Sequence, residues 1–136
     1  QYLSPADDSV RYATGFRLQR QGNSTRVTIT YPHLHATAGY NYLLVPRGTA
    51  RPPVDAHTTV IEVPIRSLVC TSTTHIPLLD YLGYSEALVG FPTTDYISSP
   101  AMRQRIEAGE VVDLGIDKGM DLEKLFSLKP DAVMGY

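Results

Sequence analysis

Four short apolar segments alternate with helical patterns after Ile65, and this alternation restricts the fold more than any other feature of the sequence. The segments lie at residues 67–71, 87–91, 111–114 and 132–136, and none of them has a polar face. Strands that are apolar on both sides are typical of parallel sheets with both faces covered. Each crossover between parallel strands must be long enough to hold a helix. The pattern therefore predicts an α/β domain with a four-stranded parallel sheet.

Capping residues mark the ends of the three predicted helices. Hydroxyl groups at residues 71–74 can accept hydrogen bonds from the free amides at the start of the first helix, and Gly83 supplies a left-handed stop. Proline is tolerated in a first turn, as at Pro77 and at Pro100 after Ser99. Gly109 closes the second helix, Asp121 caps the third, and Lys129-Pro130 ends it. The apolar side chains that recur at helical spacing and are expected to face the sheet are Ile76, Leu78, Leu79, Leu82, Ala101, Met102, Ile106, Leu122, Leu125, Phe126 and Leu128.

Residues 11–65 follow a different pattern, in which apolar and polar side chains alternate with a period of two. Two such runs flank the turn sequence "QGN" at residues 21–23, which predicts a β-hairpin. Further strands are expected at 40–45 and 59–63. The segment 46–57 is rich in proline and polar residues, so we expect a surface connection there. This part of the chain is predicted to be an antiparallel β extension.

Composition excludes several functional classes. The 136 residues are enough for one compact domain with a real core. The net charge is −2 and like charges form no block, which argues against a nucleic-acid or anionic-membrane surface. No apolar run approaches the roughly 20 residues of a membrane-spanning helix. The single cysteine, Cys70, excludes an internal disulfide and is expected to be a small core residue.

The predicted sheet indicates where a ligand would bind. In open parallel sheets, ligands bind beyond the carboxyl ends of the strands. The loops expected there are "STTH" (72–75), "PTTDYISS" (92–99), "GIDKGM" (115–120) and the residues around Tyr136. They carry hydroxyls, acids, an imidazole and aromatic rings. The loop after the first of these strands contains no glycine, which argues against a dinucleotide-binding motif.

Three segments carry a resemblance to a known family. They are "VPIRSLVCTSTTHIPLLDYLGYSEALVGF" (63–91), "DYISSPAMRQRIEAGEVVDLG" (95–115) and "GMDLEKLFSLKPDAVMGY" (119–136). Together they resemble the amino-terminal lobe of periplasmic substrate-binding proteins that serve ABC importers of iron-siderophores, haem and cobalamin. The third segment is the most specific, with a helix cap, a leucine and a glutamate before "LKPD" and a strand. Residues 1–57 resemble the β extension of some members.

The resemblance implies a fold and a function. Residues 58–136 would form a three-layer lobe whose parallel sheet has the strand order 2-1-3-4, preceded by the hairpin extension and linker of residues 1–57. The family's connecting helix and second lobe are absent from this sequence. Such proteins clamp an iron chelate or corrinoid between two lobes, catalyse no reaction, need no cofactor and deliver the ligand to permease subunits. They are periplasmic or exposed on the cell surface, and a lipid anchor in the full-length precursor would be their membrane attachment.

The resemblance also assigns roles to residues. Glu123 matches the surface glutamate that pairs with permease arginines; a carboxylate in a first helical turn is also favourable near the helix dipole. The threonines of the first loop could serve only as helix caps, and a loop tyrosine could pack over the next helix or lie flat on a ligand. The residues expected to contact ligand are Thr73, Thr74, His75, Thr94, Asp95, Tyr96, Asp117 and Tyr136.

Alternative functions remain open at this point. A cobalamin or haem receptor fits the same loops. A receptor for bare zinc or manganese would use His75 with Asp95 and Asp117, although metal sites need three or four ligands in fixed geometry. An α/β enzyme lobe would require a nucleophile and a base, for which Cys70 and His75 are the candidate pair. A free-standing β-rich interaction domain is a further alternative.

Overall fold

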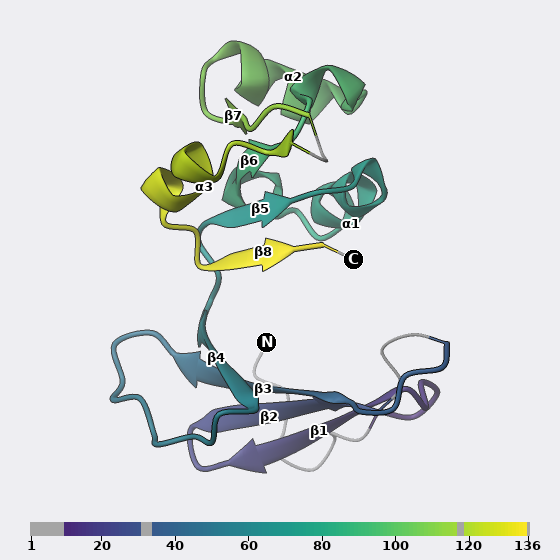
Figure 1. Cartoon of the computed structure of the whole chain (residues 1–136), viewed down its shortest axis with the longest axis vertical. Coiled ribbons are helices and arrows are strands. Elements are labelled where there is room, and N and C mark those ends of the chain that lie inside the picture. The colour runs from purple at the N-terminus through teal and green to yellow at the C-terminus, as the bar shows by residue number, and fades with distance from the viewer. Residues whose placement is uncertain (1–9, 31–33, 117–118, 136) are drawn as a thin grey trace. The chain divides into compact units, whose positions relative to one another are not determined.

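The computed structural model describes residues 10–30, 34–116 and 119–135, and the chain divides into two compact units, Gln1–Pro64 and Ile65–Tyr136 (Figure 1). The boundary lies after Pro64, whereas the sequence analysis placed it after residue 57. Strand β4 (Thr58–Val63) explains the difference, because it pairs with β3 (Tyr40–Pro46) and so belongs to the first unit.

The first unit contains the predicted hairpin. Strands β1 (Phe16–Gln21) and β2 (Ser24–Ile29) pair antiparallel, and Gly22 takes a positive φ of 62° in the turn between them. A positive φ costs glycine nothing, which explains its place in this tight turn. The third and fourth strands are also confirmed, giving the sheet order β1-β2-β3-β4.

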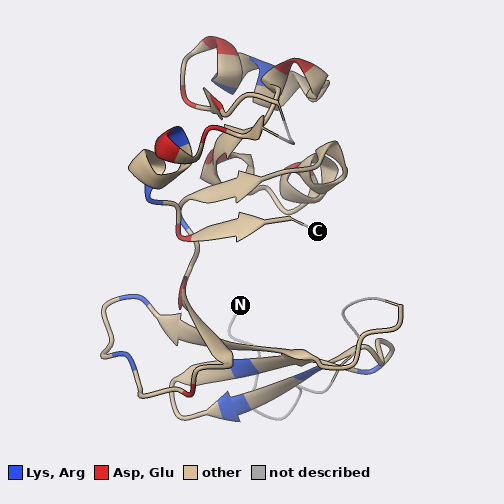
Figure 2. Ribbon diagram, viewed as in Figure 1, with Lys and Arg blue, Asp and Glu red and all other residues tan. Residues whose placement is uncertain are grey.

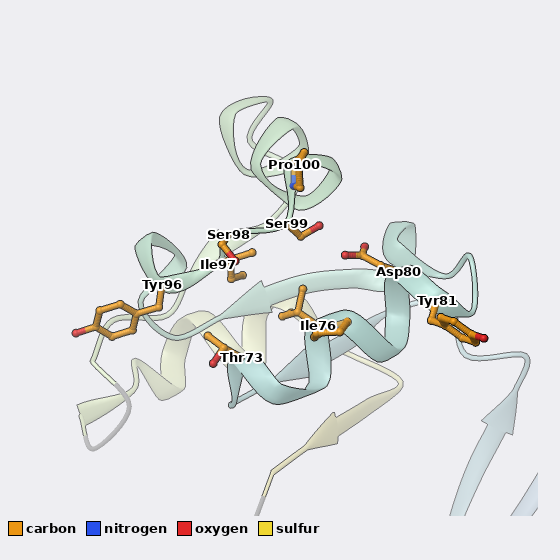
Figure 3. A pocket seen from close by; sticks show the side chains of 10 residues that line it. Thr73, Ile76, Asp80, Tyr81, Tyr96, Ile97, Ser98, Ser99 and Pro100 are labelled. Atoms are coloured by element: carbon orange, nitrogen blue, oxygen red, sulfur yellow. The ribbon is translucent and has the colours of Figure 1, made fainter.

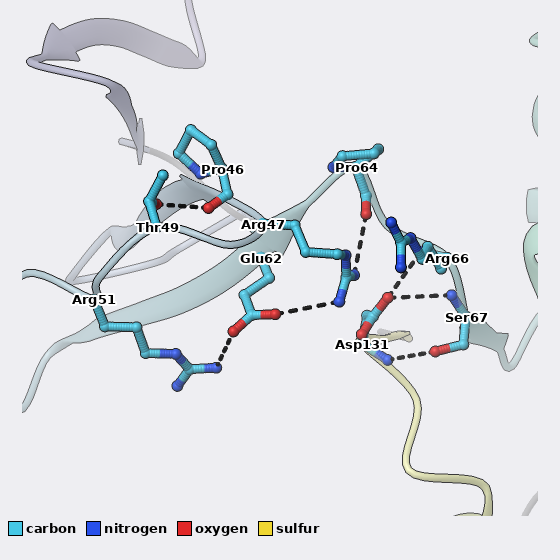
Figure 4. A network of polar contacts seen from close by, with 9 residues as sticks. All are labelled: Pro46, Arg47, Thr49, Arg51, Glu62, Pro64, Arg66, Ser67 and Asp131. Carbon is cyan, nitrogen blue, oxygen red and sulfur yellow. Dashed lines mark hydrogen bonds and ion pairs between the residues drawn. The ribbon is translucent and has the colours of Figure 1, made fainter.

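One pairing in this sheet differs from the expected antiparallel extension. β3 pairs antiparallel with β2, but β4 runs parallel to β3. A parallel neighbour requires a crossover connection, and the proline-rich linker provides it. Glu62 of β4 fixes this linker, accepting hydrogen bonds from Arg47 Nη1 at 3.2 Å and Arg51 Nη2 at 3.3 Å (Figure 4).

The second unit is the predicted α/β domain with a four-stranded parallel sheet. Its strands are arranged β7-β6-β5-β8, and every neighbouring pair is parallel. In chain order this is 3-2-1-4, so the expected order 2-1-3-4 is wrong. The elements are β5 (Leu68–Cys70), η1 (Thr73–His75), α1 (Ile76–Tyr81), η2 (Ser85–Ala87), β6 (Leu88–Phe91), η3 (Thr94–Tyr96), α2 (Pro100–Glu107), β7 (Val112–Asp113), α3 (Leu122–Leu128) and β8 (Ala132–Met134).

Asp131 explains why the last strand lies beside the first strand of this sheet. Its Oδ2 accepts hydrogen bonds from the backbone amides of Arg66 at 2.8 Å and Ser67 at 3.3 Å (Figure 4). In return, the Asp131 amide donates to Ser67 Oγ at 2.9 Å. These contacts align the start of β8 with the start of β5. They join residues far apart in the sequence, so local periodicity could not reveal them.

Alternate residues of β5 face opposite sides of the sheet. Leu68 and Cys70 belong to the main hydrophobic core. Val69 lies on the other side, near Gly90. There, a Cβ added to Gly90 would lie 2.9 Å from Leu128 Cδ1, so α3 approaches β6 closely. The members of the main core are Leu68, Cys70, Ile76, Leu79, Leu88, Phe91, Ile97, Met102 and Val111.

The helix caps agree with the sequence analysis, whereas several helix faces do not. Ser99 and Asp121 accept from the Met102 and Lys124 amides, and Gly83 takes a φ of +67°. Of the side chains expected to face the sheet, Leu78, Leu82, Ala101, Leu122 and Phe126 are exposed. The helices are short, so an error of one or two residues in the assumed helical phase moves a side chain from the sheet to solvent. No helix in the described part of the chain is both long enough and apolar enough to span a membrane.

Candidate functional site

A hollow of about 370 Å³ lies at the carboxyl ends of β5 and β6. This is the edge of the sheet where parallel α/β folds place their ligands. Its volume falls within the range of small-molecule sites, roughly 300–1,000 Å³. The walls combine hydroxyl groups with apolar and aromatic side chains: Thr71, Ser72, Thr73, Phe91, Pro92, Thr93, Tyr96 and Ile116.

The loop after β5 leaves one threonine hydroxyl available for a ligand. Ser72 is buried, and its Oγ accepts from the Thr74 amide at 3.3 Å and lies 2.8 Å from Thr74 Oγ1. Thr71 Oγ1 donates to the Met134 carbonyl at 3.3 Å. Thr73, by contrast, is exposed, and its hydroxyl makes no hydrogen bond within the described residues. The caps thus fix the loop and present Thr73 to the hollow.

The loop after β6 contains a strained residue in the wall of the hollow. Thr93 has φ +53° and ψ +68°, in the left-handed region that β-branched residues rarely adopt. Its Oγ1 donates to the Gly115 carbonyl at 2.9 Å, which joins this loop to the one after β7. Strained backbone of this kind persists where the surrounding structure holds it and is frequent at functional sites. The conformation therefore supports a binding role for this loop.

Asp113, at the end of β7, organises the same loop. Its carboxylate accepts from the Thr94 amide at 3.0 Å, from Thr94 Oγ1 at 2.9 Å and from the Gly115 amide at 2.8 Å. Burial by itself would raise the pKa of Asp113, but the hydrogen bonds from Gly115 and Thr94 outweigh it and lower the pKa below its ordinary value. The charged carboxylate thus holds the turn that carries Tyr96.

The predicted ligand contacts fall into three groups. Thr73 and Tyr96 line the hollow, and the Tyr96 side chain is 73% exposed. Thr94 is buried against Asp113, so its hydroxyl is already engaged within the protein. The remaining predicted residues are not in the wall of the hollow or lie outside the described residues. Thr74, His75 and Asp95 are not among the lining residues, while Asp117 and Tyr136 fall outside the part of the chain that the structure describes.

Residues that the sequence analysis did not select also contribute to the site. Thr71, Ser72 and Thr93 form part of the wall, with their hydroxyls engaged within the protein, and Ile116 supplies an apolar side. These residues all follow a strand at the carboxyl edge of the sheet. The sequence does show this position, so it could have identified them. Asp113 precedes Leu114-Gly115, and an acid two residues before a glycine is a typical side-chain turn signal.

The observed strand order places a topological switch point beside this hollow. The order reverses between β5 and β8, and such a switch point is where open sheets place ligands. Thr71 lies there, with its amide donating to the Met134 carbonyl at 3.1 Å. A Cβ on Gly135 would come within 3.1 Å of Thr71 Oγ1, so glycine permits this close approach. The loop after β5 therefore borders both the hollow and the switch point.

The acids and imidazoles of the described residues do not gather into a metal site. No group of three or more His, Cys, Asp or Glu side chains within residues 10–30, 34–116 and 119–135 could hold a metal ion. His75 is half-buried at the end of η1, where it precedes α1. The chemistry available at the hollow is therefore hydrogen bonding from hydroxyls together with aromatic and apolar contact.

Cys70 is fully buried in the core. Burial raises the pKa of its thiol from 9.0 to about 11. At neutral pH the thiol is therefore protonated, which makes it a poor nucleophile. This environment argues against the pairing of Cys70 with His75 in catalysis.

The raised pKa of Cys70 predicts a loss of stability in alkali. Between pH 9 and pH 11 the unfolded chain releases the thiol proton while the folded chain retains it, so the free energy of unfolding falls as pH rises. Below pH 9 the Cys70 thiol should have no effect on how the free energy of unfolding changes with pH. Urea unfolding at intervals from pH 8 to pH 11 measures the effect, with Cys70→Ala as the control. Equal pH slopes for the two proteins would contradict the prediction.

The fold and the hollow define an α/β domain with a ligand-sized site at the carboxyl edge of its parallel sheet. No protein-family model matches the chain. It is similar to an uncharacterized lipoprotein of Methanocaldococcus jannaschii, with 29% identity over 136 aligned residues that cover 91% of this chain. The chain spans about 31% of that relative's length.

Proposed function

We propose that this chain is the ligand-binding lobe of a surface receptor that captures an iron chelate and delivers it to an ABC permease. Three observations support the proposal: the sequence resemblance of residues 63–136, the ligand-sized hollow, and the similarity to a protein described as a lipoprotein. The last supports a lipid-anchored location, periplasmic or on the cell surface. The receptor makes and breaks no covalent bond and needs no cofactor.

The observation that carries the proposal is the composition of the hollow. The Thr73 hydroxyl and the exposed Tyr96 ring lie beside apolar residues in a space of about 370 Å³. The outer surface of a chelate offers oxygen acceptors for hydroxyl groups and flat faces for an aromatic ring. A complex that brings its own metal ligands does not require carboxylates or imidazoles from the protein.

The same geometry supports the three-layer lobe implied by the resemblance. Ile76 of α1 packs in the core beside Leu68 and Cys70, whereas Leu128 of α3 lies against Gly90 on the side of Val69. Helices on both faces leave the carboxyl edge of the sheet as the open end of the lobe. We propose that a second lobe closes over this edge and that the ligand is held between the two.

Substitutions in the hollow test the binding proposal. We expect Tyr96→Ala to weaken binding of a ferric trihydroxamate about tenfold, because the ring would lose its contact with the chelate. Thr73→Val should weaken it about fivefold through loss of one net hydrogen bond. Quenching of tyrosine fluorescence by the iron complex measures affinity, with cobalamin and haem titrated in parallel to compare ligand classes.

Tyr84→Ala provides the matched control for the titration. Tyr84 is 40% exposed and is not a lining residue of the hollow, so its loss should leave affinity unchanged. The proposal fails if the wild-type chain binds neither the ferric complex nor cobalamin nor haem. It also fails if Tyr84→Ala and Tyr96→Ala weaken binding equally.

Glu123 supports the proposed docking to a permease. It is exposed in the first turn of α3, whose cap is Asp121. The second unit carries ten Asp and Glu against six Lys and Arg, so basic permease residues would meet an acidic lobe (Figure 2). Opposite charges of this kind increase the rate of encounter and fix orientation more than they raise affinity.

Charge reversal at Glu123 separates docking from binding. In the receptor that contains this chain, Glu123→Arg is expected to reduce uptake about tenfold and to leave ligand affinity unchanged, because Glu123 is not among the residues that line the hollow. Radioactive iron uptake by cells measures transport, and Glu107→Arg on α2 is the control for added positive charge. Normal uptake by the Glu123 variant would exclude the docking role.

A further inference from the structure

A second and larger hollow of about 560 Å³ lies between α1 and the segment 96–100 (Figure 3). It adjoins the hollow at the carboxyl edge, because Thr73 and Tyr96 line both. Figure 3 shows Tyr96 near one end of this space and Tyr81 near the other, with α1 running between them. A ligand that occupies the first hollow can therefore extend past Tyr96 into the second without leaving the protein surface.

Buried isoleucines and two prolines form much of the second hollow. Ile76 and Ile97 are 3% and 2% exposed and form part of the core, so they give the hollow a rigid base. Pro77 and Pro100 stand at the starts of α1 and α2. Proline has few rotatable bonds, so a ligand would meet a preformed surface at little entropic cost.

Two of the polar groups in this hollow are already engaged. Ser99 Oγ accepts from the Met102 amide at 3.4 Å, and Asp80 Oδ1 accepts from Ser85 Oγ at 2.5 Å. Among the residues that the structure describes, no Lys, Arg or His lines the space, and Asp80 is the charged residue there. An anionic ligand group would meet a carboxylate and find no cation. The lining therefore favours an uncharged, apolar group.

We propose that this second hollow, hereafter the α1 hollow, is a subsite for an uncharged apolar arm of the ligand, either aromatic or aliphatic. The inference rests on the proposed function, because the polar head of the same ligand occupies the hollow at the carboxyl edge. It specifies the ligand class more narrowly: an amphiphilic chelate, with oxygen-rich groups around the metal and an apolar substituent. Tyr96 stands between the two and contacts both parts of the ligand.

A neutral aromatic probe tests the α1 hollow by itself. N-phenyl-1-naphthylamine fluoresces when it leaves water, and we expect it to bind the wild-type chain. Ser98 is exposed and lines the α1 hollow but not the hollow at the carboxyl edge, so Ser98→Trp should fill the space and weaken probe binding at least tenfold. Gln104→Trp adds the same ring on exposed α2 surface and should leave probe binding unchanged.

Tyr81→Ala provides a second test in case Ser98→Trp does not fold. Tyr81 is 93% exposed, so Tyr81→Ala should fold normally, and we expect it to weaken probe binding about threefold by removing one end of the subsite. The inference is overturned if the wild-type chain does not bind the probe. It is equally overturned if folded Ser98→Trp and Tyr81→Ala both bind the probe as the wild type does.

A pair of ferric trihydroxamates, one bare and one with an aryl arm, links the α1 hollow to the proposed function. The arm should tighten binding to the wild type at least tenfold, and Ser98→Trp should abolish this gain while binding the bare complex normally. Equal affinities of the wild type for both complexes would overturn the inference and leave the receptor proposal standing. If neither complex binds while the probe does, the iron-receptor proposal fails and the apolar subsite stands.

Discussion

Arg105→Ala is expected to lower the free energy of unfolding by about 3 kcal/mol. Arg105 Nη1 donates to the backbone carbonyls of Ser85 and Leu88, the latter at 2.7 Å, and its Nε lies 2.9 Å from Glu110 Oε2. Leu88 is completely buried at the start of β6, so its carbonyl would lose its arginine partner without ready access to water. The Arg105 side chain is only 17% exposed, so the truncation also removes packing contacts.

Glu110→Gln separates the carbonyl contacts from the ion pair of Arg105. Glu110 is 56% exposed, and exposed ion pairs contribute little, so this variant should lose less than about 1 kcal/mol. Chemical denaturation followed by circular dichroism measures both variants. A loss below about 0.5 kcal/mol for Arg105→Ala would show that the two carbonyls do not depend on this side chain.

Gly90→Val is the second change with a large expected effect, again about 3 kcal/mol. Gly90 is buried in β6, and an added Cβ would lie 2.9 Å from Leu128 Cδ1, 3.1 Å from Leu114 Cδ1 and 3.3 Å from Val69 Cγ2. Three side chains converge on this point, so a branched side chain must push α3 away from the sheet. The higher β-propensity of valine is too small an effect to compensate.

The double variant Gly90→Val/Leu128→Ala tests whether the contact with α3 causes the loss. Leu128→Ala removes the nearest of the three side chains and should by itself cost about 2 kcal/mol or less, because Leu128 is only half-buried. If the clash is the cause, the double variant will lose less than the two single losses added together. Strict additivity in denaturant unfolding would exclude this explanation.

Local sequence patterns predicted the strands and helices well, because their causes are local. The turn at Gly22, the caps at Ser99 and Asp121, and the apolar runs each depend on neighbours within a few residues. The strand order depends instead on Asp131 reaching Ser67 across the fold. The expected order came from a family resemblance and placed β7 beside β5, whereas these contacts place β8 there, and β7 pairs with β6 instead.

The sequence predicted where on the fold the candidate site lies, but only some of the residues that form it. The carboxyl edge followed from the parallel sheet, and Thr73 and Tyr96 lie in the hollow there. Thr94 was selected because it follows the second strand of the sheet, but its hydroxyl donates to Asp113 and holds the turn. Which of two neighbouring threonines faces a ligand depends on backbone angles such as the φ of +53° at Thr93. Residue type alone does not determine those angles.

Iron-edge anomalous diffraction from crystals grown with a ferric trihydroxamate tests most directly whether the carboxyl-edge hollow binds an iron chelate. Our account predicts one strong anomalous peak within the hollow, bordered by Thr73, Thr93 and Tyr96. An iron peak elsewhere on the molecule, or no peak from crystals soaked at saturating ligand, would contradict it.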